Sequence, residues 1–265
     1  MIIVAGGDSM VWGSELADCL HCGPGGFSHS TFPAILSNGY DYQCAAFPGN
    51  GNDAIARNVI IQCEKNRKKG LDQFVLVMWT FHSRYEFNFE YDNNLSWKSI
   101  NTWTIGNLYD NFEDLEKNER VVKFNKSSDE QIIKFAENYF KYIGLSGYWQ
   151  IYSSIKEILY LQNYLKTYNI PYMFTCVDNI LLYNFYTNHD DETMRSIYDQ
   201  IDMNHWILFP QGTENNETLQ PRGFYQWAVE NKYSIGTDGH PLEQAHKDAA
   251  ELIKEKFNEL VKKSI

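Results

Sequence analysis

The chain has 265 residues, a formal net charge of −11 at pH 7 and no cluster of basic residues, which argues against binding to nucleic acid or to an anionic membrane surface. Its 43% of hydrophobic residues can form a sizeable core, and the length fits a single domain spanning residues 1–265. Neither a signal-peptide pattern nor an apolar stretch long enough to cross a bilayer occurs, and the five cysteines are scattered, so we expect a cytoplasmic protein with reduced thiols.

Strands and helices are predicted to alternate along the chain. Short apolar runs bounded by turn residues predict strands at 1–5, 40–47, 73–79 and 172–177, and a weaker one at 206–209. Helical spacing predicts helices at 10–20, 31–36, 52–69, 148–168 and 242–261, and a capping box at 127–130 begins another that continues to Phe140. This order predicts an α/β fold, a three-layer α/β/α sandwich around a mainly parallel sheet of five strands.

The first predicted strand is followed at once by Gly6-Gly7-Asp8-Ser9. A serine at the tip of a strand-to-helix turn is exposed and carries a backbone N–H that points toward the same space. These are the properties of a nucleophile that attacks a carbonyl carbon and stabilises the resulting oxyanion. The alternative is that Asp8 and Ser9 only cap the helix, which both residue types do well.

Near the other end of the chain, a glycine-rich loop contains Asp238-Gly239-His240-Pro241, with the proline at the natural first position of the last helix. A loop of this kind can present His240 as a general base to Ser9, with Asp238 orienting the imidazole ring. His246, six residues further on, is expected to be structural.

Taken together, the two stretches resemble the SGNH, or GDSL, hydrolase family, whose members carry Gly-Asp-Ser near the N-terminus and an Asp…His-Pro block near the C-terminus. The resemblance covers the whole chain in order, but only as short islands. It implies a flavodoxin-like sheet and serine esterase chemistry with no cofactor. The family spacing is Asp-x-x-His, whereas one residue separates Asp238 from His240 and Thr237 occupies the family's acidic position. Either Asp238 orients His240 from a tighter loop, or another acid or a backbone carbonyl does so.

The resemblance also implies an oxyanion hole. It places Gly49, in the loop after the second predicted strand, beside Ser9 as a second backbone donor. The family's third donor is the asparagine of a Gly-x-Asn-Asp block after the third strand, where this chain reads Trp79-Thr80-Phe81-His82. Either Thr80, His82 or Asn52 supplies the missing donor, or the hole has two donors.

Residues 88–126 show no clear periodicity and are rich in aromatic side chains, which indicates a functional insertion. Aromatic faces suit sugar rings and protein interfaces equally well, and packing of a lid over the sheet is the alternative. Arg84 and Glu86 are expected to pair with each other or to bind a charged substrate. The predicted substrate-binding residues are His82, Arg84, Trp97 and Trp103.

Cys19-Leu20-His21-Cys22 has the spacing of a metal or redox motif, but no second cysteine pair follows it, so we expect no metal site. The resulting hypothesis is a hydrolase that acts on a small-molecule or carbohydrate ester, such as an O-acetyl sugar, through an acyl-enzyme on Ser9. An O-acyltransferase with the same residues is one alternative. A catalytically inert carbohydrate- or protein-binding protein with the same fold is another.

Overall fold

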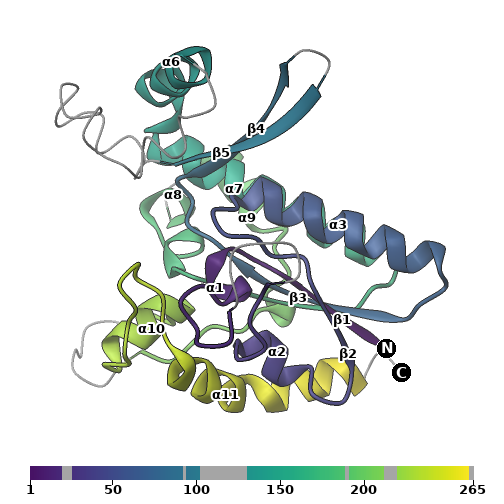
Figure 1. The fold of residues 1–265 in the computed structure, drawn as a ribbon. Coiled ribbons are helices and arrows are strands. Elements are labelled where there is room, and N and C mark those ends of the chain that lie inside the picture. The colour runs from purple at the N-terminus through teal and green to yellow at the C-terminus, as the bar shows by residue number, and fades with distance from the viewer. Residues whose placement is uncertain (20–25, 92–93, 102–129, 189–190, 212–219, 263–265) are drawn as a thin grey trace.

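The computed structural model describes residues 1–19, 26–91, 94–101, 130–188, 191–211 and 220–262. Its centre is a parallel sheet of four strands in the order β2-β1-β3-β6 (Figure 1). The strands are β1 (Ile2–Gly6), β2 (Asp41–Cys44), β3 (Gln73–Trp79) and β6 (Tyr172–Cys176). Every residue of β1, β3 and β6 is buried, as expected of parallel strands covered on both faces. The chain is therefore a mixed α/β protein, as predicted.

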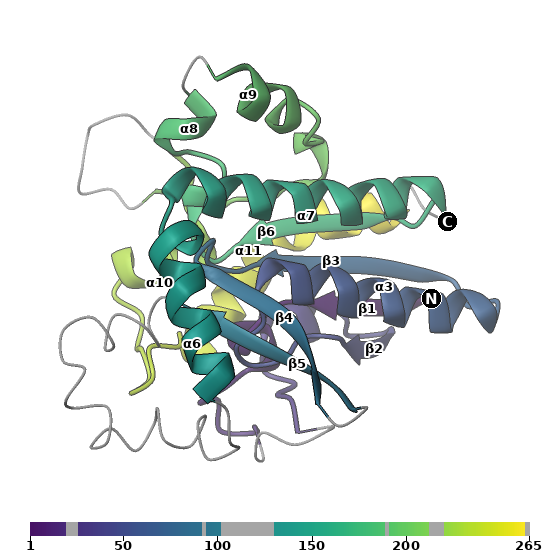
Figure 2. The same cartoon turned by 90° about the horizontal axis from the view of Figure 1, so that it is seen from above.

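Successive side chains of the central strands enter two separate cores. Val4, Val77 and Phe174 pack beneath α3 (Asn52–Lys68) and α7 (Gly147–Thr167). On the opposite face, Ile3, Ala5 and Leu76 pack against α2 (Phe32–Leu36), α10 (Phe224–Glu230) and α11 (Glu243–Lys262). This alternation is the two-residue period of a strand. It gives a sheet between two layers of helices (Figures 1 and 2).

The predicted fifth strand is wrong in the described part of the chain, because residues 206–209 form only an isolated parallel bridge between Trp206 and Phe174. The Ile207 N–H still donates to the Phe174 carbonyl oxygen at 2.8 Å. The chain then turns away, so that Phe209 pairs in the antiparallel sense with Arg222, and Pro210 has no N–H to extend a ladder.

The predicted helix at 10–20 is also much shorter in the structure. It is α1 (Ser9–Trp12), which ends at Gly13 in the left-handed conformation with φ of 83°. A glycine in this conformation is a common helix terminator. Glu15 consequently lies outside the helix, in the turn that follows it.

Residues before and within the predicted insertion form a separate antiparallel hairpin, β4 (Arg84–Tyr91) and β5 (Asn94–Asn101). Tyr85 and Ile100 of this hairpin pack against Phe140, in the π-helical turn (Phe140–Gly144) that follows α6 (Glu130–Tyr139). Figure 1 shows the hairpin and α6 together on one side of the sheet. Residues 92–93 and 102–126 of the predicted insertion, and residues 127–129 of the predicted capping box, lie outside the described residues.

The remaining described helices are short and lie between β6 and α10. They are the 3-10 helices Asn179–Leu181 and Met203–His205, and the α-helices α8 (Phe185–Asn188) and α9 (Glu192–Tyr198).

Candidate functional site

Ser9 lies where the sequence predicts it, just after the carboxyl end of β1, as the first residue of α1. Asp8 caps this helix, because its Oδ1 accepts the Met10 N–H at 3.0 Å. Asp8 is completely buried, and Ser9, which was expected to be exposed, is also buried, with an exposed fraction of 7%. The strand–turn–helix arrangement is the one that holds an activated serine in many hydrolases. Capping is therefore performed by Asp8, which leaves the Ser9 hydroxyl for another partner.

That partner is His240, in the loop between α10 and α11. Its Nε2 lies 2.8 Å from the Ser9 Oγ, although 231 positions separate the two residues. The predicted approach of His240 to Ser9 is thus present in the folded chain. The distance is that of a nucleophile and its general base.

The acid beside the other ring nitrogen is Glu15, which corrects the prediction that Asp238 orients His240. Oε2 of Glu15 lies 2.8 Å from His240 Nδ1. Asp238 instead donates its backbone N–H to Glu15 Oε1, also at 2.8 Å. The physical reason is that α1 ends early and Glu15 adopts a left-handed conformation with φ of 69°, so its side chain reaches the loop that carries His240.

The Glu15 carboxylate also organises that loop. In addition to the Asp238 N–H and the His240 ring, it accepts the Thr237 hydroxyl at 2.8 Å and the His240 N–H at 3.3 Å. A Cβ on Gly236 would lie 2.5 Å from Glu15 Oε2, so a larger residue there would displace the carboxylate from its present position. Sequence reasoning missed Glu15 because no local spacing connects it with His240.

Hydrogen bonding keeps Glu15 ionised. Burial by itself would raise the pKa of Glu15, but the bonds from Asp238, His240 and Thr237 outweigh burial and lower it from 4.5 to about 2. An ionised Glu15 holds the proton of His240 on Nδ1 and leaves Nε2 as the acceptor for the Ser9 hydroxyl.

This depressed pKa predicts a pH-dependent contribution to stability. Because the folded-state pKa lies below the unfolded one, Glu15 stabilises the fold above about pH 4.5, and the contribution is lost as the pH falls toward 2. We expect Glu15→Gln to unfold more easily than the wild type at pH 7, by on the order of 2 kcal/mol. Urea unfolding between pH 7 and pH 3 should show this difference shrinking on acidification; a constant difference would contradict it.

The loop that carries Gly49 lies against the same turn. The Phe47 N–H and the Asn50 side-chain amide both donate to the Gly7 carbonyl oxygen, at 3.4 and 3.0 Å. Gly49 has φ of 85°, and apart from its neighbours in the chain no described residue places a heavy atom within 4 Å of where its Cβ would be. Among the described residues, none accepts a hydrogen bond from the Ser9 or Gly49 N–H. Both donors are therefore available to an oxyanion.

Thr80 and Asn52, the predicted alternatives for a third donor, are committed to each other. Thr80 donates its N–H to Asn52 Oδ1 at 2.9 Å and its hydroxyl to Asp8 Oδ2 at 2.6 Å. The Asn52 side-chain amide donates to the Thr80 carbonyl and to the Ser154 hydroxyl. Since these groups already have partners, the assignment of Thr80 and Asn52 to the oxyanion hole is wrong for this conformation.

Arg84 and Glu86 do not pair with each other as predicted. Arg84 forms an ion pair with Asp8 at 2.8 Å, and Glu86 forms one with Arg57 at 2.5 Å. The Arg57 guanidinium also lies over the ring of Trp97, 3.7 Å from its centroid. Trp97 belongs to the hairpin, and its side chain remains half-exposed.

The other two predicted substrate-binding residues have different outcomes. His82 follows β3 at the carboxyl edge of the sheet, and burial lowers its pKa. Its Nδ1 atom is buried and has no hydrogen-bond partner in the described part of the chain. Trp103 lies outside the described residues.

His246 is a core residue, as expected. Its Nδ1 accepts the Phe32 N–H at 3.2 Å, and its ring packs against Phe32 and Phe224. Burial lowers the pKa of His246 to about 3, with a smaller contribution from His240. The ring is consequently neutral at physiological pH and has a structural role.

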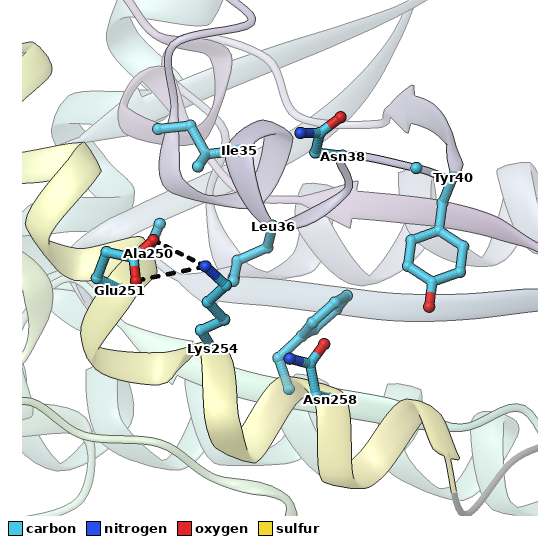
Figure 3. A pocket seen from close by; sticks show the side chains of 10 residues that line it. Ile35, Leu36, Asn38, Tyr40, Ala250, Glu251, Lys254 and Asn258 are labelled. Carbon is cyan, nitrogen blue, oxygen red and sulfur yellow. Dashed lines mark hydrogen bonds and ion pairs between the residues drawn. The ribbon is translucent and has the colours of Figure 1, made fainter.

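A cavity of about 490 Å³ between α2 and α11 is separate from this site (Figure 3). Its walls include Leu36, Tyr40 and Lys254, and Lys254 pairs with Glu251 at 3.0 Å. Asn38 and Tyr40 precede β2, so the cavity adjoins the amino end of that strand, whereas Ser9 follows the carboxyl end of β1. The cavity therefore does not belong to the serine site.

The described residues contain no group of three or more His, Cys, Asp or Glu side chains arranged to hold a metal ion. None of the helices in the described ranges combines the length and the apolar composition needed to span a bilayer.

Comparison with known proteins gives no significant match to a family model, to a curated protein or to a solved structure.

Proposed function

We propose that the protein is a serine esterase of the SGNH type, with Ser9, His240 and Glu15 as its catalytic triad. The observation that carries this proposal is the continuous series of contacts from Ser9 Oγ to His240 Nε2 and from His240 Nδ1 to Glu15, each of 2.8 Å. Nucleophile, base and orienting acid are recognised by such geometry and not by their order in the chain. The parallel sheet between helical layers is compatible with the SGNH fold.

The proposed reaction has two steps. Ser9 Oγ attacks the acyl carbonyl carbon while its proton passes to His240 Nε2, and the Glu15 carboxylate stabilises the imidazolium. The tetrahedral intermediate then expels the alcohol, which takes the proton from His240. In the second step, His240 removes a proton from water, and the resulting hydroxide attacks the acyl carbonyl carbon. The bond to Ser9 Oγ then breaks, His240 returns the proton to Oγ, and the acyl group leaves as the carboxylic acid.

Two backbone donors are proposed to stabilise the oxyanion of each intermediate. These are the N–H groups of Ser9 and Gly49, which have no acceptor among the described residues. Preorganised donors of this kind are effective because they need no reorientation during the reaction. Thr80 and Asn52 bond to their neighbours, so among the candidates for a third donor only His82 has a ring nitrogen without a partner in the described part of the chain.

We further propose a polar ester, such as an O-acetyl carbohydrate, as the substrate. A cavity of about 140 Å³ lies beside Arg84, between the start of α3, the hairpin and α7. Its walls combine carboxylates with aromatic rings, the pairing that suits the hydroxyls and C–H faces of a sugar: Asp53, Glu86, Glu157, Tyr139 and Trp149. Burial raises the pKa of Asp53 to about 6, so at neutral pH its carboxylate is mostly ionised and can accept a hydrogen bond from a hydroxyl.

The test of the proposed function is hydrolysis of p-nitrophenyl acetate by the wild type and by Ser9→Ala, followed by acetylated sugars. We expect turnover by the wild type and only the uncatalysed rate with Ser9→Ala. Ser37→Ala is a suitable control, because Ser37 is buried at the end of α2 and its hydroxyl donates to the Ala34 carbonyl oxygen, away from the Ser9 site. Equal rates for wild type and Ser9→Ala on all esters would reject the esterase and favour an inert binding protein.

A further inference from the structure

A buried ion pair adjoins the nucleophile and has no part in the proton transfers described above. Asp8 Oδ2 accepts hydrogen bonds from Arg84 Nη1 at 2.8 Å and from the Thr80 hydroxyl at 2.6 Å. The Asp8 side chain is fully buried, and that of Arg84 is 17% exposed. A carboxylate removed from water in this way requires a charged or hydrogen-bonding partner.

The same carboxylate holds the turn that carries Ser9. While Oδ2 faces Arg84, Oδ1 accepts the Met10 N–H and so fixes the first turn of α1. Asp8 directly precedes Ser9, and Met10 directly follows it. The Asp8 carboxylate thus connects both sides of Ser9 to the loop following β3. The guanidinium and the Ser9 turn therefore share one carboxylate.

Arg84 is itself held in place by several contacts. Nη1 also donates to Thr80 Oγ1 at 3.0 Å, and the guanidinium lies over the ring of Phe81 at 5.2 Å from its centroid. Thr80 is in turn fixed by Asn52 at the start of α3. The ends of β1 and β3 and the start of α3 are therefore joined by one network of hydrogen bonds beside the nucleophile.

We propose that Arg84 is a positioning residue, which acts through Asp8 to hold the Ser9 turn so that Ser9 Oγ meets His240 Nε2. This inference rests on the proposed function, because it assigns Arg84 a part in the same reaction. Binding of an anionic substrate group is the less favoured role, since Arg84 already donates to Asp8 and Thr80 and is mostly buried. A planar guanidinium fixed by several bonds also suits a structural brace better than a mobile ammonium does.

The kinetic test compares Arg84→Met, Arg84→Lys and the control Arg67→Met on p-nitrophenyl acetate. Arg67 pairs with Glu64 near the far end of α3. We expect Arg84→Met to lower kcat about a hundred-fold with little change in KM, because small displacements of a nucleophile have effects of this size. Arg84→Lys should recover part of the loss, and Arg67→Met should match the wild type. A raised KM with unchanged kcat, or no change at all, would overturn the proposal.

A double-mutant cycle tests whether Arg84 acts through Asp8. Asp8→Asn combined with Arg84→Met removes both charges, which a buried site tolerates better than one unpaired charge. It therefore remains informative if Arg84→Met alone fails to fold. We expect the kcat of the double variant to be reduced, but to be no lower than that of the slower single variant. If Asp8→Asn is the only single variant that folds, its kcat is the value for comparison. If the effects multiply, or if the double variant with both charges removed has the wild-type kcat, Arg84 does not act through Asp8 and the proposal is overturned.

A spectroscopic measurement separates this proposal from the proposed function. The ¹⁵N signals of the His240 ring report its contact with Ser9 whether or not the protein hydrolyses esters, and the buried His246 serves as an internal reference. We expect Arg84→Met, or the double variant, to shift the His240 signals and to leave those of His246 unchanged. Unchanged His240 signals would overturn the positioning role even in an active enzyme. Absent hydrolysis by the wild type would instead reject only the proposed function.

Discussion

Replacing Glu15 with glutamine is expected to lower kcat by about 10⁴-fold, the size of effect seen when the acid of a serine triad becomes an amide. Glutamine has nearly the same shape but no negative charge. It therefore stabilises neither the imidazolium nor the tautomer of His240 in which Nε2 accepts the Ser9 proton. The measurement is the steady-state rate on an activated ester with both proteins shown to be folded.

Asp238→Asn is the matched control for this substitution. The bond from Asp238 to Glu15 uses the backbone N–H, which the replacement preserves. We expect kcat to change by less than about ten-fold, because the acid beside Nδ1 is untouched. If Asp238→Asn were as damaging as Glu15→Gln, the assignment of the acid to Glu15 would be contradicted.

Replacing His240 with alanine should have a larger effect, about 10⁶-fold in kcat, because both the base for Ser9 and the acid for the leaving alcohol are removed. Members of a triad act as a unit, so Ser9→Ala combined with His240→Ala should be no slower than either alone. His246→Ala, by comparison, is expected to affect stability through its buried contacts with Phe32 and Phe224. Multiplicative losses in the Ser9 and His240 double variant would show that the two residues do not act together.

The parts of the site that could be predicted from the sequence are those with a local signature. A short apolar strand followed by Gly-Asp-Ser indicates a serine at the tip of a turn, and a histidine before a helix-starting proline indicates a residue presented by a loop. Ser9 and His240 have these signatures, and the structure brings them to 2.8 Å. The prediction that the two residues meet rested on the rule that functional side chains collect at the carboxyl edge of a parallel sheet.

Glu15 had no comparable signature. Its contact with His240 spans 225 positions, and it depends on a helix that ends after one turn and on a left-handed conformation in a residue other than glycine. Gly13 and Gly236 were visible in the sequence, but their consequences depend on tertiary contacts. The close spacing of Asp238 and His240 favoured the wrong acid, because proximity in sequence says little about where a carboxylate points.

The hairpin has a sequence signal of its own in its first strand. Arg84–Tyr91 reads RYEFNFEY, in which aromatic residues alternate with polar ones as in a half-buried strand. The fifth strand illustrates the reverse case. Residues 206–209 are apolar enough to resemble a strand, yet one bridge at Trp206 is all that forms before the chain pairs with Arg222.

The most direct test of the central claim is labelling with a fluorophosphonate, which reacts with serines that are activated as nucleophiles. The protein would be treated at neutral pH, digested and analysed by mass spectrometry, with His240→Ala treated in parallel. The triad of Ser9, His240 and Glu15 predicts one adduct, on the peptide containing Ser9, that is lost in His240→Ala. No adduct, an adduct on another residue, or equal labelling of Ser9 in both proteins would contradict it.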